Sequence, residues 1–271
     1  MLLPFGHGKL PKINQYQQSK NCRDSIKDNI MINSGGNNLW FVRSPLSLGG
    51  VQVTSQMTIV KTTLNQLILI SPVKIDESLK SEIEALGQVA WIVAPNNFHH
   101  LFISSAKQAF PEAKIVCPEG LPKKIKTLEE HSIIDVNDGN VWGADLEALR
   151  LYNGGLGDEH VFFHGPSQTL ILTDLFMWFD EKTNFATKIF TALMGVNSET
   201  PKMSRMMKWI YRDKAVLRES FRKILDWDFN RVLLAHSRNI ELDAKPQIRE
   251  AMSFLIPVDN KAASENQQKT G

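Results

Sequence analysis

Side chains able to bind a metal or carry a proton stand next to predicted strands at four places in the sequence. These side chains are His99 with His100, Glu159 with His160, Asp174, and His236. Neutral imidazole and carboxylate are the ligands that zinc, iron and manganese take where thiolate is absent. Because strand ends in an α/β fold meet at one edge of a sheet, we predict that these residues share one site.

Each of these residues also has an ordinary structural interpretation. A histidine after a strand is more often a hydrogen-bonded loop residue than a ligand, and an aspartate there is more often a helix N-cap. Asp174 precedes a helix-like stretch and fits the second interpretation. The combination of residues along the chain, rather than any one of them, therefore supports the prediction of a site.

Other motifs give weaker signals. His164 lies in a predicted hairpin turn, and Ser167 lacks the G-x-S-x-G context of a serine hydrolase. The glycines of residues 154–157 precede a strand rather than a helix, so they do not form a phosphate cradle. The basic run from Lys202 to Lys223 is interpreted as the solvated face of amphipathic helices. A surface for an anionic substrate or membrane headgroup is the alternative interpretation of this run.

The elements that must position these residues form two β-rich halves, each followed by helix and strand units. Strands are expected at Leu39–Val42, Gln56–Lys61, Gln66–Ile70, Val89–Ala94, Lys114–Cys117, Leu146–Tyr152, Val161–Phe163, Thr169–Leu172 and Arg231–Ala235. Helices are expected at Asp76–Leu86, Leu101–Phe110, Leu121–Leu128 and Ala244–Leu255, and within residues 176–228. This order predicts an αββα sandwich of two packed mixed sheets with helices outside. A doubly wound parallel sheet is the alternative, and the consecutive hairpin-like strands count against it.

The composition is that of one medium-sized globular domain. The chain has 271 residues, a net charge of +2 and 42% hydrophobic residues, which is enough to bury a substantial core. The near-balanced charge gives no general argument for nucleic acid or an anionic membrane as a partner. Cys22 and Cys117 have no metal-ligand spacing, so we expect no disulfides and a cytoplasmic location. No apolar run reaches the roughly 20 residues of a membrane span, and the N-terminus does not resemble a signal peptide.

We expect three segments along the chain. Residues 1–38 are rich in Asn, Gln, Lys and Ser and are predicted to be a disordered extension. Residues 39–256 form the domain, and residues 257–271 form a loose tail. The sequence does not indicate the oligomeric state.

The segment Pro95-Asn96-Asn97-Phe98-His99-His100-Leu101-Phe102 and the later Thr173-Asp174-Leu175 resemble motifs of the metallo-β-lactamase fold superfamily. The resemblance is closest to a branch of unknown function marked by a Pro-Asn-x-x-His-His-Leu-Phe loop, and it covers residues 39–256. It implies the αββα fold and a metal-dependent hydrolase. Metal-binding members carry His-x-His-x-Asp-His, then a lone His, an Asp and a late His. In this chain the resemblance implies ligands at His100, His160, Asp174 and His236, with His99 at the aspartate position.

Two positions depart from that motif. Pro95 and Asn97 stand where its first two histidines are expected. One metal site therefore keeps only His100 and His160, with Asp174 if it bridges. The neighbouring site keeps His99, Asp174 and His236. We accordingly predict a single divalent ion held by some of these five residues, with zinc expected and iron or manganese as alternatives, and with His99 and Asp174 as catalytic residues.

Three functions follow from these expectations. The first is a metal-dependent hydrolase acting on a small molecule of unknown identity, with His99 as the base and a metal-activated water as the nucleophile. The second is a metal-free, catalytically lapsed protein that acts as a binding module or scaffold, because Pro95 and Asn97 remove two ligands. The third is redox chemistry at iron, which in related folds uses more carboxylates than this loop offers.

Overall fold

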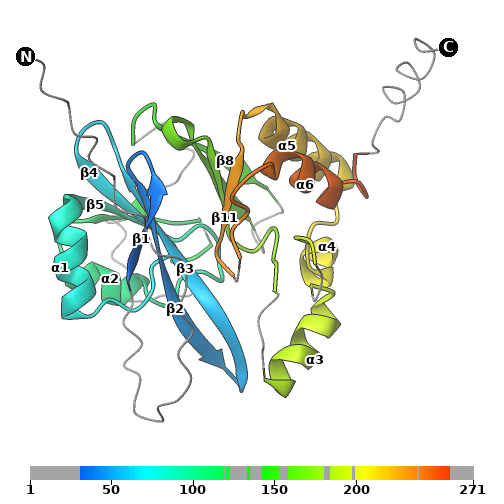
Figure 1. Cartoon of the computed structure of the whole chain (residues 1–271), viewed down its shortest axis with the longest axis horizontal. Helices are drawn as coiled ribbons and strands as arrows, with labels where there is room; N and C mark the ends of the chain where they lie inside the picture. Colours follow the sequence, from blue (N-terminus) through cyan, green and yellow to red (C-terminus); the bar gives the residue numbers. More distant parts are fainter. Residues whose placement is uncertain are drawn as a thin grey trace, which may run out of the picture.

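The computed structural model describes residues 31–118, 120–122, 133–134, 142–152, 158–179, 184–196, 199–236 and 238–256. Two β-sheets pack against each other (Figure 1), one with the strand order β1-β2-β3-β4-β5-β6-β7 and the other with the order β11-β10-β9-β8. Figure 1 shows α1 and α2 beside the first sheet and α5 and α6 on the opposite side of the molecule, beside the second. The predicted αββα sandwich is confirmed.

The first sheet is antiparallel from β1 to β4 and parallel from β4 to β7. Its strands are β1 (Ile32–Gly36), β2 (Leu39–Leu48), β3 (Val51–Lys61), β4 (Gln66–Ile70), β5 (Gln88–Val93), β6 (Lys114–Val116) and β7 (Ile133–Ile134). The crossover helices are α1 (Glu77–Leu86), which Asp76 caps, and α2 (Ile103–Ala109). Because β4 and β5 are parallel, the segments that follow them, beginning at Ser71 and Ala94, lie at the same edge of the sheet.

The second sheet brings three further segments to one edge. Its strands are β8 (Leu146–Leu151), β9 (Glu159–His164), β10 (Thr169–Leu172) and β11 (Arg231–Leu234). Strands β10 and β11 are parallel, so the residues after them, Thr173 and Ala235, lie close together. Strand β9 is antiparallel to β10 and therefore begins at this same edge. The helices of this half of the chain are α3 (Phe185–Met194), which contacts β3 of the first sheet, and α4 (Arg205–Ile210), α5 (Lys214–Asp226) and α6 (Ala244–Ala251).

Apolar side chains fill the space between the sheets and the space beneath the helices on each side. The layer between the sheets includes Leu39, Val60, Ile68, Phe162, Ile171 and Leu233, all buried. A backbone hydrogen bond from Gln56 N to Ala235 O, 2.8 Å long, and a bridge between Asn96 and Glu159 join the two sheets at the edge where β5, β10 and β11 end. The core therefore aligns the two edges that carry the candidate site residues.

The structure differs from the predicted elements mainly at the start of the domain. Strand β1 lies inside the segment predicted to be a disordered extension, and its Asn-Ser-Gly-Gly sequence has no apolar alternation that could have revealed it. Strands β2 and β3 are also longer than predicted, because their outer halves are mixed polar and apolar. Most of the predicted helix at 121–128, the first 30 residues and the tail lie outside the described residues. No helix in the described ranges is long and apolar enough to cross a membrane.

Candidate metal centre

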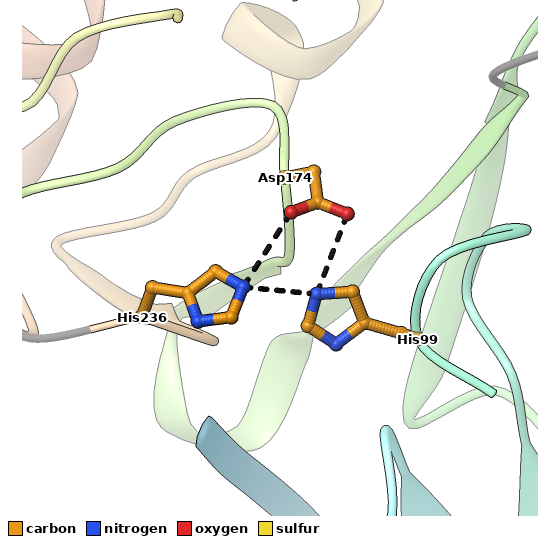
Figure 2. Close-up of side chains that lie close together, drawn as sticks. All are labelled: His99, Asp174 and His236. Carbon is orange, nitrogen blue, oxygen red and sulfur yellow. Dashed lines mark hydrogen bonds and ion pairs between the residues drawn. The ribbon is translucent and has the colours of Figure 1, made fainter. Parts of the chain in front are cut away.

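Three of the predicted residues, His99, Asp174 and His236, meet where the edges of the two sheets are aligned (Figure 2). His99 Nε2 lies 3.2 Å from His236 Nε2 and 3.3 Å from Asp174 Oδ2. His236 Nε2 lies 3.5 Å from Asp174 Oδ1. Within the described part of the chain, this is the only group of three or more His, Cys, Asp or Glu residues whose ligand atoms lie within 4.8 Å of one another.

Each imidazole is anchored through its Nδ1 atom. His236 Nδ1 lies 3.0 Å from the backbone oxygen of Thr54. Because a carbonyl can only accept, this nitrogen carries the proton, and in the neutral ring Nε2 presents its lone pair to the centre. His99 Nδ1 lies 2.7 Å from Ser71 Oγ, a hydroxyl that can accept in the same way. The Phe179 ring stacks on His236 with centroids 6.4 Å apart and fixes its plane.

Ser71 is a site residue that the sequence analysis missed. It follows β4 with a φ of 57°, in the left-handed region that serine rarely adopts. Its backbone N–H donates to the oxygen of Val93, and the residue is only 3% exposed. Non-glycine residues held in this region cluster at functional sites. Its position directly after a parallel strand was the signal available in the sequence.

Asn96 holds two members of the group in place and was also missed. Its Nδ2 donates to Asp174 Oδ2 over 2.7 Å and to Thr173 Oγ1 over 3.2 Å. Its Oδ1 accepts from the backbone N–H groups of Phe98 and His99, each over 2.8 Å. One fully buried side chain therefore shapes the turn that carries His99 and orients the carboxylate of Asp174.

Glu159 supports the turn that carries Asp174. Its carboxylate accepts from Thr173 N over 2.8 Å and from Asp174 N over 3.2 Å. Burial, followed by the charge of Asp174, raises the pKa of Glu159 to about 7. Burial also opposes the ionisation of Asp174, but His99 and His236 outweigh it and hold the pKa of Asp174 well below its usual range. The centre therefore contains one carboxylate that stays ionised between two imidazoles.

The three side chains fit a divalent metal ion. Bonds of about 2.0–2.1 Å in a tetrahedral arrangement place ligand atoms roughly 3.3–3.4 Å apart. The separations found here, 3.2, 3.3 and 3.5 Å, are close to that value. Burial lowers the pKa of His236, but the hydrogen bond and charge of Asp174 outweigh it and raise this pKa. The site therefore attracts a positive charge, which a metal ion supplies when it replaces the proton.

His100 and His160 are not members of this group, although the resemblance implied that they are ligands. His160 is fully buried, and its Nδ1 lies 3.1 Å from the oxygen of Pro95, which also accepts from the backbone N–H of His160 over 2.8 Å. His160 thereby joins β9 to the loop that carries His99. The residues that the structure brings together are those of the neighbouring implied site, with His99 in place of a carboxylate. Asp174 is not a helix N-cap, because the next described helix, α3, begins with Asn184 as its cap.

A cavity of about 280 Å³ borders the three residues. Its walls are mainly apolar and include Leu46, Val53, Phe98, Leu101, Met177 and Phe190. Apart from the three residues of the centre, its polar side chains are Ser55 and Ser71. No Lys or Arg lines it among the residues that the structure describes. The cavity is therefore suited to a small uncharged ligand.

Comparisons with known proteins agree with this fold. The family model of a domain of unknown function (DUF4336) matches residues 36–197, whereas no curated protein matches the sequence. A metallo-β-lactamase from Pontibacter korlensis is similar with a TM-score of 0.56 and 14% identity, over 83% of this chain and 99% of that chain. The metal-soaked Flv1 flavodiiron core from Synechocystis sp. PCC6803 is similar with a TM-score of 0.58 and 12% identity, over 83% of this chain and 60% of that chain. The metallo-β-lactamase FIM-1 from Pseudomonas aeruginosa in its mono-zinc form has a TM-score of 0.55 and 12% identity, over 84% of this chain and 97% of that chain.

Proposed function

The chain belongs to the DUF4336 family, whose function is unknown. From the geometry of the centre we propose that it is a metal-dependent hydrolase with one divalent ion held by His99, Asp174 and His236. The observation that carries this proposal is the convergence of two Nε2 atoms and a carboxylate, from three separate segments, at metal-ligand spacing. Zinc is the expected ion, and iron and manganese accept the same donors. A divalent ion in such a site polarises a carbonyl or phosphoryl oxygen and provides a water nucleophile at neutral pH.

The protein residues have distinct roles in this proposal. Asp174 supplies the negative charge that offsets the ion, and its depressed pKa makes it a ligand and a poor proton acceptor. His99 uses Nε2 as a ligand atom while Nδ1 donates to Ser71, so we propose His99 as a ligand rather than the general base expected from the sequence. The hydroxyl hydrogen of Ser71 is then available to a ligand in the cavity, which Ser71 lines. Ser71 is placed to hydrogen-bond a substrate oxygen.

The cavity indicates the class of substrate. A cavity of 150 Å³ holds benzene, so one of about 280 Å³ holds on the order of ten non-hydrogen atoms. Apart from the proposed ion, no Lys or Arg among the described lining residues would offset a group with two negative charges, such as a phosphate monoester. We therefore propose an uncharged ester or amide that carries a compact apolar group.

Metal analysis of the full chain, purified without chelator, tests this proposal. About one ion per chain is expected, and His99→Ala, Asp174→Ala and His236→Ala should each lower its affinity strongly. His100→Ala is the matched control, because it removes an imidazole next to His99 that lies outside the group, and it should keep the metal. Loss of the metal in the control would refute the three-residue centre.

A metal-free binding protein is the competing function, and one observation favours it. The 3.2 Å between the Nε2 atoms of His99 and His236 also fits a hydrogen bond in which one ring donates to the other. In that case the purified chain contains no stoichiometric metal, and added zinc does not raise its melting temperature. These two results together would sink the hydrolase proposal, whereas a clear rise in the melting temperature of the metal-free chain on addition of zinc supports it.

A further inference from the structure

Helix α3 exposes its large apolar side chains and buries small polar ones. Phe185, Ile189 and Leu193 are 78%, 46% and 64% exposed, and their spacing of four residues places them on one face. The buried residues of the helix are Thr187 and Thr191. This is the reverse of the pattern expected for a surface helix, whose apolar face packs on the core.

The outward face is held in a fixed orientation by hydrogen bonds on the inner face. Thr187 Oγ1 accepts from Gln52 N over 2.8 Å and donates to Gln52 O over 3.0 Å. Asn184 caps the helix by accepting from Thr187 N over 2.9 Å, and its Nδ2 donates to Gly50 O over 2.9 Å. Figure 1 shows α3 at the periphery of the molecule, near the turn between β2 and β3.

Exposed apolar side chains continue from α3 to the mouth of the cavity. Phe190, the residue after Ile189, lines the cavity, and so do Leu48, Phe98 and Leu101, which are 57%, 42% and 56% exposed. We call the following six residues the docking surface: Phe185, Ile189, Leu193, Leu48, Phe98 and Leu101. Exposed apolar surfaces that are rimmed by polar residues mark interaction sites.

The charged side chains within α3 and α4 are all of one sign. Helices α3 and α4 contain Lys188, Arg205 and Lys208 and no Asp or Glu. Arg205 donates to the oxygens of Ala192 and Leu193 at the end of α3, so its charge lies next to the apolar face. Trp209 of α4 is 62% exposed. Apolar and aromatic side chains flanked by Lys and Arg are typical of helices that lie in a membrane interface.

We propose that the docking surface binds an anionic lipid membrane, with the apolar face of α3 in the boundary between headgroups and acyl chains. The cationic side chains of α3 and α4 then contact anionic headgroups. The cavity mouth faces the bilayer in this position, because Leu48, Phe98 and Leu101 belong both to the docking surface and to the lining of the cavity. A second copy of the chain is a poorer occupant, since a two-fold contact through this face would bring like charges together.

Flotation of the full chain with lipid vesicles tests this proposal. Binding is expected to vesicles that contain phosphatidylserine, to be much weaker with pure phosphatidylcholine, and to fall as salt is raised. The triple variant Phe185→Ser, Ile189→Ser, Leu193→Ser should lose about 1000-fold in partitioning, since each of the three buried apolar side chains contributes about tenfold. Lys188→Gln should lose about fivefold.

Leu64→Ser is the matched control, because Leu64 is 71% exposed in the turn between β3 and β4 and lies outside the docking surface. It should bind vesicles as the wild type does. The triple variant should keep the wild-type melting temperature, because the residues changed are exposed. The proposal is overturned if the wild type does not float with anionic vesicles, or if the triple variant binds as well as the control. It is also overturned if the wild type and the Leu64→Ser control are dimers in solution and the triple variant is a monomer. Vesicle binding should persist in Asp174→Ala, so this result is independent of the metal centre.

Discussion

Replacing Asn96 with alanine should damage both the stability of the protein and its metal centre. The side chain is fully buried and makes four hydrogen bonds. Its Oδ1 accepts from the backbone N–H groups of Phe98 and His99, and its Nδ2 donates to Asp174 Oδ2 and Thr173 Oγ1. Alanine therefore leaves two backbone donors without this acceptor and removes one donor from an ionised carboxylate.

The magnitude follows from these bonds. Each neutral hydrogen bond contributes about 1 kcal/mol, and a bond to a charged group contributes about 1.5–3 kcal/mol. Asn96→Ala, which removes three neutral bonds and one bond to a charged group, should therefore lower the free energy of unfolding by about 4.5–6 kcal/mol. That is a large part of the roughly 5–15 kcal/mol typical of a domain. Because Asn96 orients both His99 and Asp174, the metal affinity should also fall, by about 10–100-fold.

Asn96→Asp separates the two roles of the side chain. The aspartate keeps one oxygen that accepts from Phe98 N and His99 N. Its other carboxylate oxygen takes the place of Nδ2, 2.7 Å from Asp174 Oδ2. Two carboxylates this close oppose each other's ionisation, so the metal-free variant should be destabilised. A divalent cation relieves this repulsion, and zinc should therefore raise the stability of Asn96→Asp more than that of the wild type.

Urea unfolding with and without zinc, together with calorimetric zinc titration, measures both effects. Asn184→Asp is the control, because Asn184 also accepts a backbone N–H and donates to an oxygen, but that oxygen is the backbone oxygen of Gly50 and not a carboxylate, and the residue lies at the surface. It should change stability by less than about 1 kcal/mol. The reasoning is refuted if Asn96→Ala costs no more than the control, or if its zinc affinity equals that of the wild type.

Three further predictions concern the same site. Burial lowers the pKa of His236, but Asp174 outweighs it and raises this pKa. Protons therefore compete with zinc for His236 already at a pH above the usual histidine pKa of about 6.5, and the zinc affinity should fall as the pH is lowered toward that value. Zinc titrations at pH 8, 7 and 6 measure this, and a constant affinity would contradict it. The pKa of Glu159 is raised from 4.5 to about 7 by burial and then by Asp174, so the stability from this group is complete below pH 4.5 and lost as the pH rises through 7. Urea unfolding of the metal-free Glu159→Gln variant should lack this slope, and an unchanged slope would contradict the assignment. Val53→Trp fills the cavity and should abolish binding of a small apolar fluorescent probe without changing the zinc content. Val216→Trp is the control, because Val216 is partly exposed on α5, and it should change neither the probe binding nor the zinc content.

The fold class was predictable because most of the central strands and several of the helices have regular apolar patterns. The strand Thr169–Leu172 has the predicted bounds. Helices were predicted within residues 176–228 without bounds, and α3, α4 and α5 lie in this range. Strand β1 was not predictable, because its pairing with β2 comes from backbone hydrogen bonds and not from side-chain alternation. The outer halves of β2 and β3 were missed for a similar reason, since their apolar residues line a cavity instead of a continuous core.

Sequence reasoning found the residue types of the site but not which of them meet. His99 and His100 are neighbours with the same side chain, and only the fold of the turn, set by Asn96, decides which one joins Asp174 and His236. The anchors of the two rings were also hidden, because one is a backbone oxygen, that of Thr54, and the other is an ordinary serine. Hydrogen bonds of this kind depend on three-dimensional proximity and leave no pattern in the sequence.

The hairpin of β2 and β3 connects the proposed centre with the proposed membrane surface. Strand β3 pairs with β4 only from Thr58 to Lys61, so the outer half of the hairpin extends beyond the sheet. A two-stranded hairpin alone is marginally stable in water. Here its tip is held by the hydrogen bonds of Gln52 and Gly50 to α3, while Val53 and Leu48 form one wall of the cavity. The same contacts that fix α3 with its apolar face outward therefore also keep the cavity beside the centre, so a membrane bound at α3 lies at the entrance of the proposed active site.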